Sequence, residues 1–194
     1  MLKRLCIIWV IVAGPCFGVH AERPAGIVLY FESGGEVFLL LADNQGNDRG
    51  WHAYGGSPLE GENTAETAAR ETEEETRGYF LRDDLLIKIK DQEPVIDHNG
   101  FALYFAEIPF VPAQLVTNNP VPNDDQSYSE RGPYAWIPYS ELEPYLEGPV
   151  NSDKRYTIEA RFLPRECNTS WFWSVWLGNV RRAIETKSIP WTIK

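Results

Sequence analysis

The chain has 194 residues, of which 43% are apolar and 13% are aromatic, enough to bury one ordinary hydrophobic core. It carries 28 acidic and 18 basic residues, which gives a formal net charge of −10 at pH 7. An acidic surface repels nucleic-acid backbones, and no run of lysines and arginines suggests a basic patch. These values predict a single globular domain with no nucleic-acid partner.

Residues 1 to 21 have the three parts of a secretory signal peptide. A basic start, MLKR, precedes the apolar stretch LCIIWVIVAG, and the small residues Val19 and Ala21 stand at the positions preferred before cleavage. A membrane anchor is the alternative, but a spanning helix needs about 20 apolar residues, and Pro15 arrives too early. The same proline fits poorly with lipidation at Cys16. We therefore expect an exported protein, periplasmic or secreted, with no stable membrane association after cleavage.

Cleavage would leave Cys167 as the single cysteine of the mature chain, so no intramolecular disulfide is available. We assign this thiol no role, since a lone cysteine is more often a buried small residue than a nucleophile. His52 and His98 have no metal-like spacing with it, so no zinc site is expected. The sequence does not fix the oligomeric state, and a homodimer is compatible with it.

The mature chain alternates β-rich and helical segments. Residues 26 to 32 and 36 to 43 predict two strands that are joined by a Ser-Gly-Gly turn. Residues 64 to 77 contain no glycine or proline and are rich in alanine and glutamate, which predicts a helix that ends at Gly78. The remaining expected elements are strands over 85–91 and 100–110, an extended loop over 111–132, a strand from Tyr134 into a short helix near 139–146, and a Trp-rich helix over 169–187.

The helix over 64–77 is expected to have an acidic face. Glu71, Glu74 and Glu75 stand at i, i+3 and i+4, so their carboxylates lie together, at a cost of about 0.2–0.5 kcal/mol per exposed pair. A solvated face is one interpretation, and a site for Mg²⁺ or Mn²⁺, which prefer oxygen ligands, is the other. Glu66 and Arg70 are four residues apart and are expected to pair. Small residues predict the face that lies on a sheet: Ala65, Ala68, Ala69, Thr72 and Thr76.

The spacing of charged residues around this helix favours the metal site. A glycine is followed after five residues by a glutamate, after seven more by Arg-Glu, and after two more by Glu-Glu. This order resembles the signature of the Nudix hydrolases, with Gly55 adding the double glycine that is usual before it. The matching positions are Gly56, Glu62, Arg70, Glu71, Glu74 and Glu75.

Two positions depart from the family pattern, and both concern packing or helix termination. Thr72 replaces an aliphatic residue, and Arg77 stands where a glycine is usual, with Gly78 one place later. The resemblance implies an α/β fold, an α/β/α sandwich with a mixed central sheet and a C-terminal Trp-rich helix. It implies one Nudix domain over residues 22–194, with a core over about 26–147 and a helical extension over 148–194.

The resemblance also implies roles for single residues. Glu71, Glu74 and Glu75 would hold Mg²⁺ or Mn²⁺, completed by a backbone carbonyl at Gly56, and Arg70 would orient Glu71. Glu62 would support the loop before the helix and in some members of the family aids metal binding. The proton acceptor for the attacking water would be Glu75, Glu71 or a loop residue, for which Glu130 is the candidate, although Glu130 is equally compatible with an ordinary loop carboxylate. The catalytic set is then Glu75, Glu71, Arg70 and Glu130.

The sequence indicates the chemical class of the substrate but not the individual compound. Family membership implies a small nucleotide-type substrate, a nucleoside diphosphate linked to another group, such as a nucleoside diphosphate sugar or a related dinucleotide. Trp51, Trp171 and Phe172 are candidates for stacking on a base, whereas Trp173 continues a helical apolar stripe and is expected in the core. The alternative function is a nucleotide-binding module without catalysis, but such a module has no physical need for three clustered carboxylates.

Overall fold

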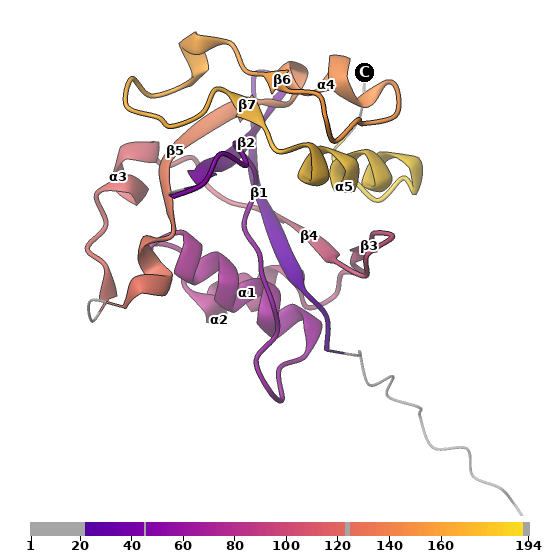
Figure 1. The fold of residues 1–194 in the computed structure, drawn as a ribbon. Helices are drawn as coiled ribbons and strands as arrows, with labels where there is room; N and C mark the ends of the chain where they lie inside the picture. Colours follow the sequence, from indigo (N-terminus) through magenta and orange to yellow (C-terminus); the bar gives the residue numbers. More distant parts are fainter. Residues whose placement is uncertain (1–21, 45, 123–124, 192–194) are drawn as a thin grey trace, which may run out of the picture.

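The structure is a computed structural model that describes residues 22–44, 46–122 and 125–191 (Figure 1). The predicted signal peptide over residues 1–21 lies outside these ranges. Within them, no helix has both the length and the apolar content needed to cross a membrane.

A five-stranded mixed sheet forms the centre of the fold, in the order β3-β4-β1-β2-β5. Strand β1 pairs antiparallel with β2 and parallel with β4, while β5 joins the outer side of β2 and β3 the outer side of β4. The predicted hairpin is thereby confirmed, with Leu29 opposite Leu40 in its register. The strands are β1 (Ala25–Ser33), β2 (Glu36–Asn44), β3 (Val95–Ile96), β4 (Ala102–Glu107) and β5 (Arg131–Pro138).

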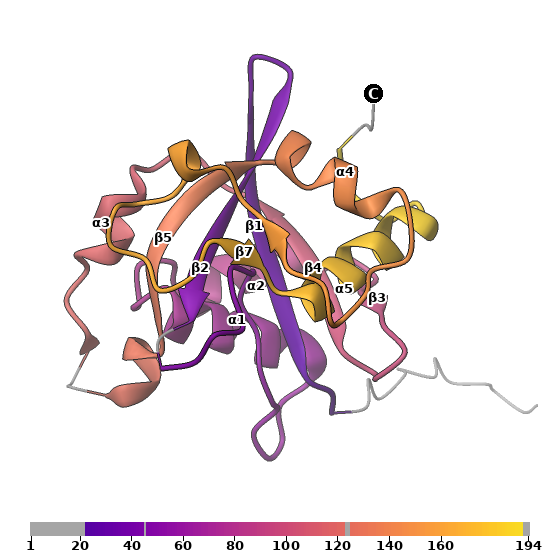
Figure 2. The ribbon, with the colours of Figure 1, turned by 45° about the horizontal axis from the view of Figure 1, so that its top comes forward.

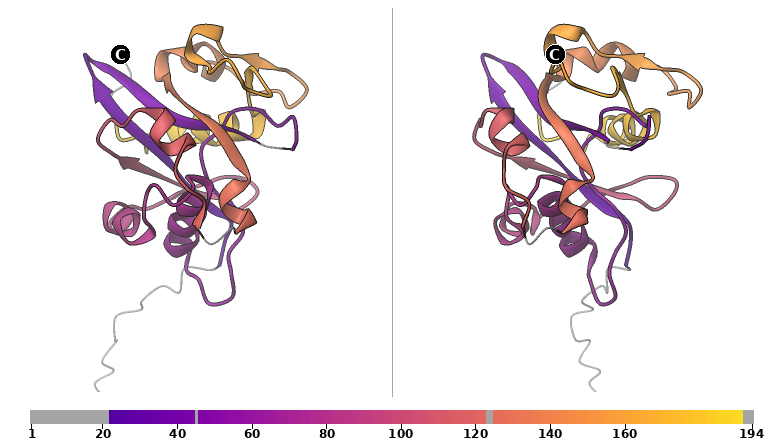
Figure 3. Two further views of the ribbon diagram at one scale, coloured as in Figure 1. Left: turned by 90° about the vertical axis from the view of Figure 1, so that its left-hand side faces the viewer. Right: turned by 60° about the vertical axis from the view of Figure 1, so that its left-hand side comes forward.

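Helices and a small second sheet cover the two faces of the central sheet, so the predicted α/β/α sandwich is confirmed (Figures 1 and 3). Alternate residues of β1 face opposite layers: Ile27 packs with helices α1 and α2, and Val28 packs with the C-terminal elements. One face carries α1 (Thr64–Glu75) and α2 (Arg82–Ile89), with α3 (Ala113–Thr117) beside β5. The other carries α4 (Glu143–Leu146), α5 (Ser174–Glu185) and the pair β6 (Tyr156–Thr157) and β7 (Trp171–Phe172) (Figure 2).

The predicted strand over 85–91 is wrong, because this segment forms helix α2. The alternation Ile-Lys-Ile-Lys suggested a period of two, but the buried residues are Leu85 and Ile89, at the helical spacing of four. Ile87, which would share one face of a strand with Leu85 and Ile89, is 66% exposed. Acidic residues in the first turn and Lys88 in the last turn also suit a helix dipole.

The C-terminal helix is shorter than expected. Trp171 and Phe172 pair with β6 as strand β7, and α5 begins only at Ser174. Aromatic residues favour strands, and the pairing of Trp171 and Phe172 with β6 outweighs the apolar spacing that predicted a helix from residue 169. In the segment predicted as an extended loop, residues 113–117 instead form α3, and a 3₁₀ turn, η2 (Gln126–Ser129), precedes β5. Two further 3₁₀ turns are η3 (Tyr139–Glu141) and η4 (Ala160–Phe162).

Candidate active site

Helix α1, which carries the acidic face, is fixed at its first turn by a capping box. The Asn63 side chain accepts the backbone N–H of Glu66 at 3.0 Å, and the Glu66 carboxylate accepts the N–H of Asn63 at 2.8 Å. The expected pair between Glu66 and Arg70 does not form, because Glu66 is used in this cap and Arg70 turns toward other glutamates.

The last turn of α1 explains one departure from the family pattern. Arg77 N–H donates to the carbonyl of Glu74 at 3.0 Å, and Gly78 N–H donates to that of Glu73 at 2.8 Å, which is a Schellman motif. Arg77 occupies the left-handed position with φ 57°, where glycine has no steric penalty. Two hydrogen bonds with Asn119 hold the arginine there: its Nε donates to the Asn119 carbonyl, and the Asn119 amide donates to the Arg77 carbonyl.

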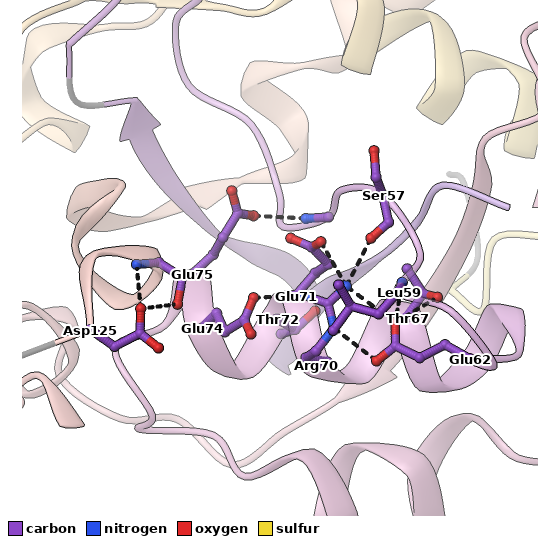
Figure 4. A network of polar contacts seen from close by, with 12 residues as sticks. Ser57, Leu59, Glu62, Thr67, Arg70, Glu71, Thr72, Glu74, Glu75 and Asp125 are labelled. Carbon is purple, nitrogen blue, oxygen red and sulfur yellow. Dashed lines mark hydrogen bonds and ion pairs between the residues drawn. The ribbon is translucent and has the colours of Figure 1, made fainter. Parts of the chain in front are cut away.

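Arg70 lies at the centre of the acidic cluster (Figure 4). Its Nε donates to Glu62 at 2.8 Å, its Nη1 to Glu74 at 2.7 Å and its Nη2 to Glu71 at 3.0 Å. Nη2 also donates to the carbonyl of Ser57 at 2.8 Å. One guanidinium therefore ties the loop before α1 to two carboxylates of the helix.

Glu62 fastens this loop rather than facing the other glutamates. Its carboxylate accepts the backbone N–H of Leu59 at 3.0 Å and the hydroxyl of Thr67 at 3.2 Å. Burial acts to raise the pKa of Glu62, but the hydrogen bonds from Arg70 and Leu59 outweigh it and lower the pKa below its ordinary value. Glu62 is therefore a charged anchor for Arg70.

At Glu71 and Glu74, in contrast to Glu62, burial outweighs the hydrogen bonds and charge of Arg70, and the pKa of each carboxyl group rises. Burial raises the pKa of Glu71 to about 7, against the opposing effect of Arg70. Burial also raises the pKa of Glu74, again despite Arg70. Burial outweighs the attraction of Arg70 at both carboxylates, so a cation bound beside them would stabilise their charged forms.

Glu75 is buried and has separate partners. Its Oε2 accepts the backbone N–H of Gly55 at 2.7 Å, and its Oε1 lies 3.3 Å from Nη1 of Arg131. Burial raises its pKa, while Arg131 and the Gly55 N–H act to lower it. Arg131 begins β5 and is 1% exposed. Sequence analysis missed it, because a lone arginine at the start of a strand carries no signature.

Of the predicted site residues, Gly56, Glu71, Glu74, Glu75 and Glu130 line one cavity of about 450 Å³, between α1, η2 and the first turns of α5. Arg70 is not part of the cavity lining and contacts it through Glu71 and Glu74. The cavity brings together the acidic face of α1 and Glu130, which is exposed and follows η2. Aromatic and cationic side chains from α5 and the loop after β2 also line it. Its lining includes Arg49, His52, Gly55, Gly56, Glu71, Glu74, Glu75, Phe101, Glu130, Arg131, Trp173, Trp176 and Asn179.

Gly56 lies directly against the carboxylate of Glu71. A Cβ added at this position would come within 2.5 Å of the Glu71 carboxylate carbon. The Gly56 carbonyl accepts the N–H of Ala25 at 3.0 Å, which engages one of its two lone pairs and leaves one for another ligand. Among residues 22–44, 46–122 and 125–191, no three carboxylate, histidine or cysteine side chains converge as a preformed metal cluster. Arg70 engages one carboxylate oxygen each of Glu71 and Glu74, whereas Glu75 has other partners.

Of the aromatic candidates, Trp173 is the one that faces the cavity. Trp51 is 0% exposed and Phe172 is 1% exposed, so both belong to the core. Trp173 packs partly against that core but also lines the cavity, with the His52 ring centroid at 4.7 Å and the Arg49 guanidinium at 5.4 Å. Trp171 lies under Arg155, whose guanidinium is 3.9 Å from the ring centroid. The expectation for Trp173 was therefore only partly right.

Comparison with known proteins decides the family. A family model described as the NUDIX domain matches residues 21–160, which is most of the chain. The chain belongs to the Nudix family. A solved structure of a C. elegans Ap4A hydrolase in a binary complex is similar at 21% identity with a TM-score of 0.41, over 65% of this chain and 84% of that chain. No curated protein matches the chain.

The cavity of this Nudix hydrolase is lined partly by residues inside the matched range and partly by residues beyond it. The acidic face of α1, Arg131 and Glu130 all fall inside the matched residues. Trp173, Trp176 and Asn179 lie beyond residue 160, so the side of the cavity formed by α5 comes from outside the matched range.

Proposed function

We propose that this Nudix hydrolase is an exported, Mg²⁺- or Mn²⁺-dependent pyrophosphohydrolase. Its substrate is a nucleoside diphosphate linked to another group, and the diphosphate is the part cleaved. The observation that carries the proposal is the acidic face of α1, where Glu71, Glu74 and Glu75 line one cavity and all three have raised pKa values.

The residues present fit a divalent cation. Burial raises the pKa values of Glu71 and Glu74, so a nearby cation would stabilise their charged forms. Carboxylate and carbonyl oxygens are also the ligands that Mg²⁺ and Mn²⁺ prefer. The second carboxylate oxygens of Glu71 and Glu74 take part in no ion pair among the described residues. Glu71, Glu74 and Glu75 would therefore hold the ion, with the second lone pair of the Gly56 carbonyl as a backbone ligand.

The protein contributes position and proton transfer. A bound Mg²⁺ or Mn²⁺ supplies charge that offsets the phosphates and acidifies a water molecule. Arg70 holds Glu71 and Glu74 in fixed directions, and Arg131 does the same for Glu75. Glu130 lines the same cavity and is exposed, so it keeps the solvated carboxylate that a proton acceptor needs.

The aromatic part of the cavity lining suits a nucleoside. Trp173 and Phe101 both line the cavity, and Phe101 lies close to Gly55. A planar base gains stacking energy on such rings, and Arg49 beside Trp173 adds a cation for phosphate oxygens. A cavity of 450 Å³ falls within the range of small-molecule sites.

Turnover of a substrate panel tests the enzyme. The chain from Glu22 is incubated with nucleoside diphosphate sugars, dinucleoside polyphosphates and nucleoside triphosphates, with Mg²⁺, Mn²⁺ or chelator, and product release is measured. Glu75→Gln should abolish turnover, while Glu73→Gln, on the same helix but outside the cavity lining, should leave it unchanged. Nucleotide and metal binding without turnover on any compound would favour the binding module instead.

Export requires a separate experiment. Expression in a host with a secretory pathway should yield a protein outside the cytoplasm. Its measured mass should equal that of a chain that starts at Glu22. A cell-retained protein that still carries residues 1–21 would contradict the export proposal without affecting the enzymatic one.

A further inference from the structure

Arg131 is a buried charge that belongs to no recognised pattern of the chain. Its Nη2 donates to the carbonyls of Ala42 at 3.0 Å and His52 at 2.9 Å, while Nη1 lies 2.6 Å from the His52 ring. Burying a guanidinium is costly unless it is both hydrogen-bonded and paired with an opposite charge. Among the described residues, Glu75 is the one carboxylate that forms an ion pair with it.

His52 serves Arg131 as a neutral acceptor. Its Nδ1 lies 2.8 Å from the carbonyl of Gly50, and a carbonyl only accepts, so Nδ1 carries the proton. Nε2 then presents a lone pair to Nη1 of Arg131. Burial, reinforced by the charge of Arg131, holds the pKa of His52 well below its ordinary value. The Trp173 ring packs against the imidazole at a tilt of 58° and limits the room in which it can turn.

These contacts fix Glu75 from two sides. Gly55 N–H engages Oε2, and Arg131 engages Oε1, which leaves the remaining lone pairs of the carboxylate for the cavity. We propose that Arg131, held in place by His52, is the positioning residue for Glu75. The order of support runs from Gly50 through His52 and Arg131 to the carboxylate that lines the site. Such supporting contacts tune both the direction and the ligand strength of a carboxylate.

The inference rests on the proposed function of Glu75, and two pairs of substitutions test it. Arg131→Lys keeps the charge but loses the planar fork that reaches the carbonyls and Glu75 together. His52→Leu removes the hydrogen-bond acceptor for Arg131. His52→Gln places an amide oxygen near the position of Nε2 and should restore the hydrogen bond from Arg131. His98→Leu, at an exposed histidine, is the matched control.

If Arg131 and His52 position Glu75, their substitution should lower kcat and Mn²⁺ affinity and leave KM nearly unchanged. In Arg131→Lys and His52→Leu, kcat should fall about 100-fold, while the KM of the nucleotide changes less than about threefold, because the carboxylate and not the cavity is disturbed. Calorimetric titration with Mn²⁺ alone, without nucleotide, should show an affinity reduced about 10-fold. His52→Gln and His98→Leu should remain close to wild type in both measurements.

Wild-type turnover with unchanged kcat and unchanged Mn²⁺ affinity in Arg131→Lys and His52→Leu would overturn the inference but not the proposed function. Absence of turnover in the wild-type protein would instead overturn the proposed function. Where the variants do not fold, nitrogen-15 NMR of the wild-type protein decides. His52 should be the neutral Nδ1–H tautomer, and its Nε2 resonance should shift when Mg²⁺ is added. An Nε2–H tautomer, or no shift on adding Mg²⁺, would refute the proposed chain of support.

Discussion

Gly56→Ala should strongly lower the activity of this protein without unfolding it. The added Cβ would lie 2.5 Å from the Glu71 carboxylate carbon, whereas carbon atoms in contact stay about 3.5 Å apart. The carboxylate must therefore move by about 1 Å. Such a movement also weakens its 3.0 Å bond to Arg70. The clash falls on the end of a flexible side chain, and Gly56 has no left-handed φ, so the backbone has no reason to change.

The expected magnitude follows from this displacement. A shift of about 1 Å in a reacting group costs on the order of 100-fold in rate, so kcat of Gly56→Ala should fall by about that factor. The free energy of unfolding should fall by less than about 1 kcal/mol, the scale of one exchanged hydrogen bond. Turnover with Mg²⁺ and urea unfolding measure the two quantities separately.

Substitutions at two other glycines serve as controls, one without a steric clash and one with a clash against the backbone. Gly148→Ala meets no atom within 4 Å and should change neither quantity. Gly26→Ala places its Cβ 1.9 Å from the backbone carbonyl of Tyr54 and should strongly destabilise the fold. Full activity in Gly56→Ala would show that the Glu71 carboxylate is not needed where the structure places it. Loss of stability equal to that of Gly26→Ala would refute the argument that the clash is confined to a side chain.

Three further predictions concern the helix and its surroundings. Arg77→Gly should be more stable than Arg77→Ala by about 1 kcal/mol in urea unfolding, because both lose the contacts with Asn119 but only glycine is relaxed at φ 57°. Glu130→Gln should lower kcat by at least about 100-fold with unchanged stability, and near-normal turnover would remove Glu130 as the proton acceptor. The metal-free protein should lose stability as pH rises from 4.5 to about 7, because the pKa of Glu71 is raised from 4.5 to about 7 in the folded state. The stabilisation is present below its ordinary pKa and disappears as pH rises through about 7. Glu71→Gln should flatten this decline by on the order of 2 kcal/mol, and an unchanged slope in chelator would contradict the assigned shift.

Local sequence signals predicted the parts of the fold that depend on neighbours along the chain. The β1–β2 hairpin follows from its turn, and α1 from its composition and the glycine that follows it. The prediction failed at α2, where Ile87 and Ile89 alternate with lysines but only Ile89 is buried. In an eight-residue helix, period two and period four share too many positions to be separated by pattern alone.

The candidate site divides in the same way. Glu71, Glu74 and Glu75 share a face because of helical spacing, which the sequence contains directly. Arg131 reaches Glu75 only because β5 pairs with β2 and places residue 131 beside the loop around His52. No spacing in the chain reports that approach across 56 residues, so only the tertiary structure reveals it.

The two arginines of the site show why both kinds of information are needed. Arg70 distributes its charge over three carboxylates, and two of them still have raised pKa values, which leaves them receptive to a further cation. Among the residues that the structure describes, Arg131 forms an ion pair with Glu75 alone and donates its other hydrogen bonds to neutral acceptors. An arginine shared among several carboxylates can yield to a metal ion, whereas one that serves a single carboxylate fixes its direction. Neighbouring glutamates on one helix therefore meet different electrostatic conditions, and the contacts outside the helix determine which of them is held rigidly.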